Sequence, residues 1–488
     1  MTVLPDAPDR ADVQRLALFG YTLNHSRHFV LRVTGLAQAR RFLTELVQRN
    51  LITDASLEKD DLGRRQSATL FPANIGFTFR GLEILKLRPP YLRVFQDKSP
   101  AFAEGAWLRS ARRLADTGAS AARWWDACFA PDRAHVLLSV FADRECELVN
   151  FSQGLEELPG ADGLDGWKTA LDGCQLGEKG NRRIHFGFRD GISNPEIKGL
   201  NERKRAPDSK APKAHAAGEF ILGYVNDNKY NPWLVADPLP ARDPWLLPSE
   251  RIDPAFFRNA SFAAFRKIEQ DERTFRKFVS GWALRLGVSE EYVRAKLAGR
   301  WDDGSVLRPG ADSAPPRPAA GSERADEKGK LNEFDFSDDP NGEGCPFGAH
   351  IRRMNPRADQ VVPFRGRPLI RRGMPYGRRY EDAPAERRGL LGLFFCASLE
   401  DQFEHLLAEW ANTNPMGPDN RGNAKDPLIG NHEDTETVFD LPMPDESLRQ
   451  IDGFTPFVTT RGTLYAFYPG LAALGRIARA DARICNQA

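Results

Sequence analysis

A polar, proline-containing segment at residues 200–217 divides this 488-residue chain into two parts, and this division limits the folds that the chain can adopt. A chain of this length is too long for one ordinary hydrophobic core, so two domains are expected. We take the segment as a linker and predict an N-terminal domain at 1–200 and a C-terminal domain at 216–488. A second stretch, at 309–344, is rich in Pro, Gly, Ser and charge. It is expected to be a long loop inserted in the C-terminal domain, disordered in part unless it packs against the body.

Short strands and helices are mixed in both parts. Before the linker, residues 28–34 and 135–142 are strand-like, and 37–47 has apolar residues at helical spacing. After the linker, the pattern predicts helices at 263–278, 290–297 and 399–412, and strands at 369–372 and 390–397. This mixture predicts an α+β fold.

The composition excludes several classes of protein. The net charge is +1, from 68 basic and 67 acidic residues, which argues against nucleic acid or an anionic membrane as the main partner. No apolar run approaches the length of a membrane span. The first residues lack a basic segment followed by an apolar run, so a cytoplasmic location is expected. The six cysteines include no C-x-x-C pair and indicate neither a disulfide framework nor a zinc site.

Three local sequences carry the strongest candidates for chemistry. Gly187–Gly191 places Asp190 between two glycines, which predicts a tight turn whose backbone approaches something flat or bulky. Cys345–Arg357 contains His350, and Leu369–Gly377 contains Arg371. Each motif is weak by itself, but one acid, one histidine and one arginine in three distinctive contexts together indicate a chemical site.

With these motifs the chain resembles the dye-decolorizing peroxidase family of haem enzymes. Further matching stretches at 73–82, 218–224 and 389–395 extend the resemblance over nearly the whole chain. The resemblance implies an α+β fold of two ferredoxin-like domains, of the dimeric α+β barrel type, with haem between sheet and helices. It also implies haem b bound non-covalently, and the chain has no C-x-x-C-H sequence for thioether attachment.

His350 is the candidate axial ligand of the haem iron, because neutral imidazole is a good donor to iron. A lone histidine is more often a structural residue, but the context around His350 matches the proximal-ligand motif of the family. Among the eight histidines, His185 is the one serious rival because it lies close to the acid motif.

Asp190 and Arg371 are the candidate catalytic pair. A carboxylate within reach of both peroxide oxygens can take a proton from one and return it to the other. Arginine is permanently charged and can stabilise charge on the departing oxygen. Adjacent strand residues point to opposite faces, so only one of Arg371 and Arg372 can face the haem, and the family motif assigns Arg371.

Further haem contacts follow from the resemblance. Arg357, seven residues beyond His350, matches a position that contacts haem in the family, and its charge suits a propionate. Asn355 and Pro356 hold that turn. Further expected contacts follow the acid, at Gly191, Ile192 and Ser193. Phe394 and Phe395 are candidate pocket walls, with the alternative that one of these strand residues belongs to the core.

A ligating histidine usually donates its other N–H to a carboxylate. Glu400, Asp401 and Glu404 are candidates at the start of the 399–412 helix. The family pattern favours Glu400, although acids at a helix N-terminus are also explained by the helix dipole.

The leading hypothesis is a haem peroxidase that reduces hydrogen peroxide and oxidises bulky aromatic or phenolic donors by one-electron steps. A haem carrier, sensor or haem-processing protein on the same scaffold is the alternative, and an intact Asp190 and Arg371 argue against a pure carrier. A non-haem binding module would leave the context of His350 unexplained. The sequence leaves open the physiological donor, the surface residue that would pass electrons, and whether the chain forms a homo-oligomer.

Overall fold

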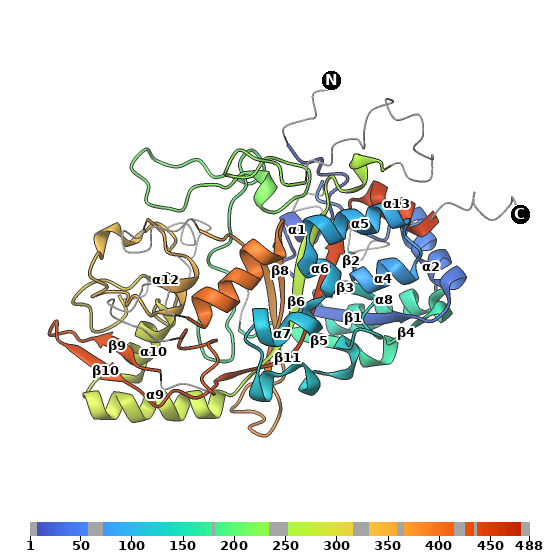
Figure 1. Cartoon of the computed structure of the whole chain (residues 1–488). Helices are drawn as coiled ribbons and strands as arrows, with labels where there is room; N and C mark the ends of the chain where they lie inside the picture. Colours follow the sequence, from blue (N-terminus) through green and yellow to red (C-terminus); the bar gives the residue numbers. More distant parts are fainter. Residues whose placement is uncertain are drawn as a thin grey trace, which may run out of the picture.

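A single antiparallel sheet of nine strands forms the centre of the part of the protein that the structure describes (Figure 1). The structure is a computed structural model that describes residues 7–56, 72–177, 181–233, 252–315, 331–358, 366–413, 425–433 and 437–479. The strands before the linker are β1 (His25–Val33), β2 (Ala73–Phe77), β3 (Val136–Ala142), β4 (Leu164–Asp165) and β5 (Leu171–Cys174). The strands after it are β6 (Ser261–Gln270), β7 (Ile370–Tyr376), β8 (Gly389–Cys396) and β11 (Val458–Tyr468).

The sheet contains the same strand order twice. Along the sheet the order is β4-β1-β3-β2-β11-β6-β8-β7, with β5 paired to β1. Each half therefore places its fourth strand beside its first and its third between its first and second, which is the order of a ferredoxin-like βαββαβ unit. The two units join where Phe77 of β2 pairs with Phe467 of β11. The fold-class prediction is confirmed, and the bounds of the two domains stay a prediction.

Helices connect the strands within each unit. The N-terminal unit contains α2 (Leu36–Gln48), α4 (Phe79–Ile84), α5 (Pro89–Lys98), α6 (Pro100–Glu104), α7 (Ala106–Arg113) and α8 (Glu145–Glu156). The C-terminal unit contains α9 (Glu272–Leu286), α10 (Glu290–Ala298), α12 (His350–Met354) and the π-helical turns Leu399–Glu404 and Leu406–Ala411. Helix α1 (Arg15–Leu18) precedes β1, and α13 (Leu471–Arg479) follows β11 and packs on α2. No described helix is long and apolar enough to cross a membrane.

Two hydrophobic cores lie on the two faces of the sheet. One contains alternate strand residues such as Leu31, Leu138 and Phe467, and most of the helices of the N-terminal unit pack on it. The other contains the intervening residues, such as Val30 and Phe265. This division follows from the two-residue period of a strand, which sends successive side chains to opposite faces.

A third core lies beside the sheet, at the left in Figure 1, and positions the candidate site. It is built from α9, α10, the start of α12 and the hairpin of β9 (Phe439–Pro442) and β10 (Leu448–Ile451). Phe186 and Phe188 of the acid motif are buried in it, and so are Phe334 and Phe336 of the 309–344 stretch. The described parts of that stretch, 309–315 and 331–344, therefore include a segment that packs against the body, and 316–330 lies outside the described residues.

One predicted helix is wrong over half its length. Residues 263–270 belong to β6, and α9 begins only at Glu272, where the Asp271 side chain accepts the Thr274 N–H and caps the helix. Strand β6 pairs along its length with β8 and β11. This pairing across the sheet outweighs the local helical spacing of the apolar residues.

Candidate active site

The three motifs meet at Ser193 and Asn194, which follow the acid. The Asn194 side-chain oxygen accepts the backbone N–H of Arg371 at 2.9 Å, and the Ser193 carbonyl accepts a bond from the Arg371 side chain. The Ser193 hydroxyl accepts a bond from Arg357 at 3.1 Å. One short loop thus holds both strand β7 and the turn after α12, although 164 residues or more separate them from it in sequence.

Asp190 lies in a turn that requires glycine. Gly187 and Gly191 have φ of +92° and +71°, in the left-handed region that residues with a side chain rarely adopt. Apart from the adjoining residues, no described atom lies within 4 Å of the place where a Cβ of either glycine would stand. The Asp190 side chain is exposed, and no described residue forms a hydrogen bond with its carboxylate. The expected turn is therefore present, with open space beside it and an available carboxylate.

Arg371 and Arg372 point to opposite faces of β7, as the strand period predicts. Arg371 is exposed, whereas Arg372 donates to the carbonyls of Leu16 at 3.0 Å and Leu18 at 2.9 Å. Arg372 therefore anchors α1 to the sheet, and Arg371 is the arginine available to a ligand.

The sheet surface beside Arg371 is open at Gly373. This glycine lies two residues further along the same face, and no described atom beyond its chain neighbours lies within 4 Å of its missing Cβ. Phe394, the cross-strand partner of Arg371 on β8, is half-buried, while Phe395 is fully buried in the core on the opposite face. Phe394 is thus the one of the two phenylalanines that can contact a ligand.

His350 begins α12 and is fixed by a buried carboxylate. Its Nδ1 lies 2.8 Å from Oδ2 of Asp426, whose side chain is completely buried. Burial by itself raises the pKa of the Asp426 carboxyl, but its interaction and hydrogen bond with the His350 imidazole and the charge of Arg353 outweigh burial and hold the pKa below its usual value. Because an ionised carboxylate only accepts, the hydrogen lies on Nδ1, and Nε2 keeps a lone pair for a metal.

The expectation that Glu400 binds His350 is wrong. Glu400 accepts the Ala101 N–H at 2.6 Å and the Ser99 hydroxyl at 3.3 Å, so it joins the N-terminal and C-terminal units instead. Asp426 lies 76 residues after the histidine, in a turn where its other oxygen accepts the N–H groups of Leu428 and Ile429. The Asp426-Pro sequence could have indicated such a turn, but nothing local connects it to His350.

The remaining predicted residues form the frame of the site. Asn355 ends α12, with its N–H donating to Ile351 at 3.0 Å, and the buried Pro356 precedes Arg357. Ile192 is half-buried against Gly304. The rival His185 is buried with Nε2 on the Tyr376 carbonyl at 2.8 Å, and burial lowers its pKa.

Known proteins similar to this chain include dye-decolorizing peroxidases. No family model matches the chain. The chain is 28% identical to the dye-decolorizing peroxidase msp1 of Mycetinis scorodonius, over 95% of this chain and 86% of that protein. It is 32% identical to the multifunctional dye peroxidase DyP2 of an Amycolatopsis species, over 59% of this chain and 60% of that protein.

The chain is similar to dye-decolorizing peroxidases over nearly its whole length.

Solved structures of dye-decolorizing peroxidases share the fold along the whole chain. An ancestral D-type dye-decolorizing peroxidase superposes with a TM-score of 0.76 and 26% identity, over 96% of this chain and 99% of that one. The DyP-type peroxidase of Anabaena sp. superposes with a TM-score of 0.72 and 22% identity, over 96% of this chain and 94% of that one.

Peroxidases of this family depend on haem, and the residues present fit that cofactor. The imidazole of His350 has its Nε2 side available, and Arg371 and Gly373 offer a cation beside an open surface. Arg357 is buried, and its Nε has no hydrogen-bond partner in the described part of the chain. A buried cation with an unused donor suits a carboxylate such as a haem propionate.

Proposed function

We propose that this protein is a haem peroxidase that reduces hydrogen peroxide and oxidises bulky aromatic or phenolic donors in one-electron steps. The observation that carries the proposal is the loop at Asp190–Asn194. It presents an exposed carboxylate, holds the exposed Arg371, and binds the Arg357 that follows the candidate ligand His350. A haem carrier has no need of the carboxylate and the exposed arginine.

The residues would hold haem b without a covalent bond. Nε2 of His350 would bind the iron, and Asp426 would keep the imidazole in the required tautomer and orientation. Arg357 would bind a propionate. Gly191 and Ile192 would allow the edge of the macrocycle to come close to the loop, since the space beside Gly191 is open.

Haem, when bound, supplies the redox-active iron at which peroxide is reduced. Asp190 would take a proton from the incoming peroxide and return it to the oxygen that leaves as water. Arg371 would stabilise the negative charge on that departing oxygen, and its hydrogen bonds to Ser193 and Asn194 hold it ready for this role.

A phenolic donor is supported by the family. One similar structure, with a TM-score of 0.75 and 24% identity, is a dye-decolorizing peroxidase in complex with 2,6-dimethoxyphenol. We propose donors of this class for the present chain. We also propose a cytoplasmic location, which the free thiols of the five described cysteines support.

Haem titration of the purified protein followed by a peroxide assay tests the proposal. We expect a Soret band after addition of one equivalent of haem, and oxidation of 2,6-dimethoxyphenol that depends on hydrogen peroxide. Asp190→Asn should keep the Soret band and lose most of the oxidation rate. Bound haem without donor oxidation would favour a carrier or sensor, and a protein that binds no haem would contradict both.

A further inference from the structure

Two buried arginines lie against the same aromatic ring near the candidate site. The guanidinium carbons of Arg300 and Arg357 lie 4.9 Å and 4.3 Å from the centre of the Phe334 ring. The two arginines are 6% and 8% exposed, and each has one buried nitrogen with no hydrogen-bond partner in the described part of the chain, Nη2 in Arg300 and Nε in Arg357. Arg300 was not predicted as a site residue from the sequence.

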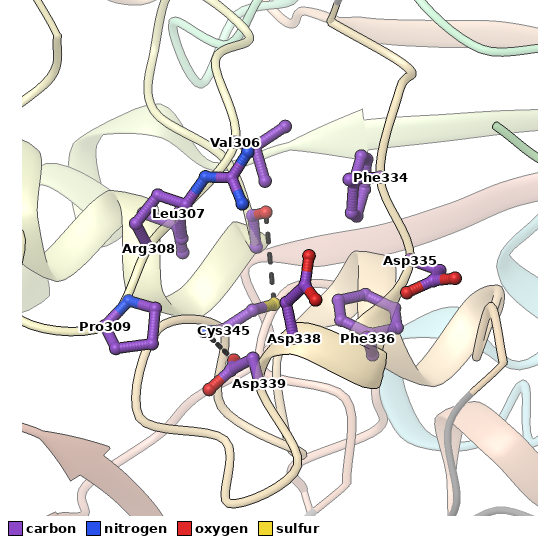
Figure 2. A pocket seen from close by; sticks show the side chains of 11 residues that line it. Val306, Leu307, Arg308, Pro309, Phe334, Asp335, Phe336, Asp338, Asp339 and Cys345 are labelled. Atoms are coloured by element: carbon purple, nitrogen blue, oxygen red, sulfur yellow. Dashed lines mark hydrogen bonds between the residues drawn. The ribbon is translucent and has the colours of Figure 1, made fainter. Parts of the chain in front are cut away.

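The segment 331–334 supplies most of the hydrogen bonds that hold the two arginines. The Leu331 carbonyl accepts from Arg300 at 2.6 Å. The Asn332 side-chain oxygen accepts from Arg357 at 2.6 Å, and the Asn332 and Phe334 carbonyls accept further bonds from it. This segment lies in the second half of the 309–344 stretch. Figure 2 shows its Phe334 at the small cavity of about 20 Å³ that Val306 and Cys345 also line.

In the described part of the chain, these two arginines donate to backbone carbonyls and neutral side chains. Some other buried arginines pair with an acid, as Arg109 does with Glu404 at 2.6 Å, whereas the buried Arg388 is held by backbone carbonyls. No described carboxylate forms an ion pair with Arg300 or Arg357. Burial is the main cause that lowers the pKa of Arg357 to about 9 and that of Arg300 to about 10, and the positive charge of Arg371 lowers both further.

Two nearby buried cations with unused donors favour a compensating anion. Arg357 and Arg371 both bind Ser193, and Arg300 lies on the same Phe334 ring as Arg357, so the two buried arginines are close to the proposed haem site. A carboxylate accepts several hydrogen bonds from guanidinium groups and carries the missing charge.

We propose that Arg300, together with Arg357, binds a carboxylate of the haem cofactor, and that segment 331–334 is the clasp that keeps both arginines in position. The inference rests on the proposed function, because it requires haem as the ligand. It assigns a cofactor-retaining role to Arg300 and to segment 331–334, in addition to that of Arg357.

Haem transfer to an excess of apomyoglobin tests this role without any peroxidase assay. The release rate is measured for haem and for haem dimethyl ester, in which both propionates are neutral. The wild-type protein should release the ester at least about 10-fold faster, because hydrogen bonds to charged groups contribute about 1.5–3 kcal/mol. Arg300→Met should release haem faster and lower the ester-to-haem ratio several-fold, while the remaining Arg357 keeps it above 1.

Matched variants separate binding from folding. Arg308→Met removes an exposed arginine near the same cavity and should keep the wild-type ratio. Asn332→Ala leaves both guanidinium groups in place and should lower the ratio in part, which tests the clasp even if Arg300→Met does not fold. If Arg300→Met and Asn332→Ala accelerate release of both ligands equally, the arginine is only structural and the inference is wrong. A wild-type protein that binds neither ligand overturns the proposed function itself.

Discussion

Replacement of Asp426 by asparagine should disable His350 as a ligand while changing the fold very little. The carboxylate accepts three hydrogen bonds, from His350 at 2.8 Å, Leu428 at 2.9 Å and Ile429 at 3.0 Å. The side-chain oxygen of asparagine can still accept the N–H groups of Leu428 and Ile429, and its NH₂ group then faces Nδ1 of His350. Nδ1 must become an acceptor, which moves the imidazole hydrogen to Nε2 and removes the lone pair that would bind iron.

The expected effect is a 10- to 100-fold loss of haem affinity. A hydrogen bond to a charged group contributes about 1.5–3 kcal/mol, and about 1.4 kcal/mol corresponds to a factor of ten. The same range is typical when a carboxylate behind a metal-binding histidine is removed. The reduction potential of the bound haem should also rise, because a less basic imidazole stabilises the oxidised iron less.

Haem titration followed by absorbance, together with potentiometry, measures both effects. Glu400→Gln is the matched control: Glu400 binds Ser99 and Ala101 rather than His350, and glutamine can still accept from both. This control should keep the wild-type affinity and potential. An Asp426→Asn protein with unchanged affinity, spectrum and potential would refute the tautomer argument, and a loss in Glu400→Gln alone would restore Glu400 as the partner.

Four further outcomes are expected. His350→Ala should lose most bound haem or its histidine-ligated spectrum, and full occupancy with an unchanged spectrum would exclude this residue as the ligand. Asp190→Asn should slow the reaction with peroxide about 10²–10⁴-fold and Arg371→Leu about 10²–10³-fold in stopped-flow measurements, with haem retained. Arg372→Leu should react normally but unfold at lower urea concentration, and the reverse pattern for the two arginines would show that the strand parity is misassigned. Because the fold lowers the pKa of Asp426, its carboxylate stabilises the apoprotein above about pH 3.9, and this stabilisation is lost as pH falls through the lower folded pKa. The free energy of urea unfolding, measured from pH 2.5 to 6, should therefore depend less on pH in Asp426→Asn than in the wild-type protein. An equal pH dependence in the two proteins would contradict the assignment.

Local sequence rules account for the parts of the site that depend on neighbouring residues. The two glycines around Asp190 predict a left-handed turn, and the structure has it. The two-residue strand period separates Arg371 from Arg372, and the hydrogen bonds of Arg372 to α1 agree. Spacing alone failed at residues 263–270, where the apolar residues suit a helix but pair with strands on both sides.

By itself, the sequence determined the α+β class, the resemblance to dye-decolorizing peroxidases and the three motifs, because each depends on short-range periodicity or on a continuous stretch of residues. Only the tertiary structure decided that Asp426 rather than Glu400 binds His350, and that Arg300 joins Arg357 at Phe334. The bond between His350 and Asp426 spans 76 residues, and that between Arg357 and Asn332 spans 25. Such pairings are set by which loops pack against each other, and no periodicity along the chain records that choice.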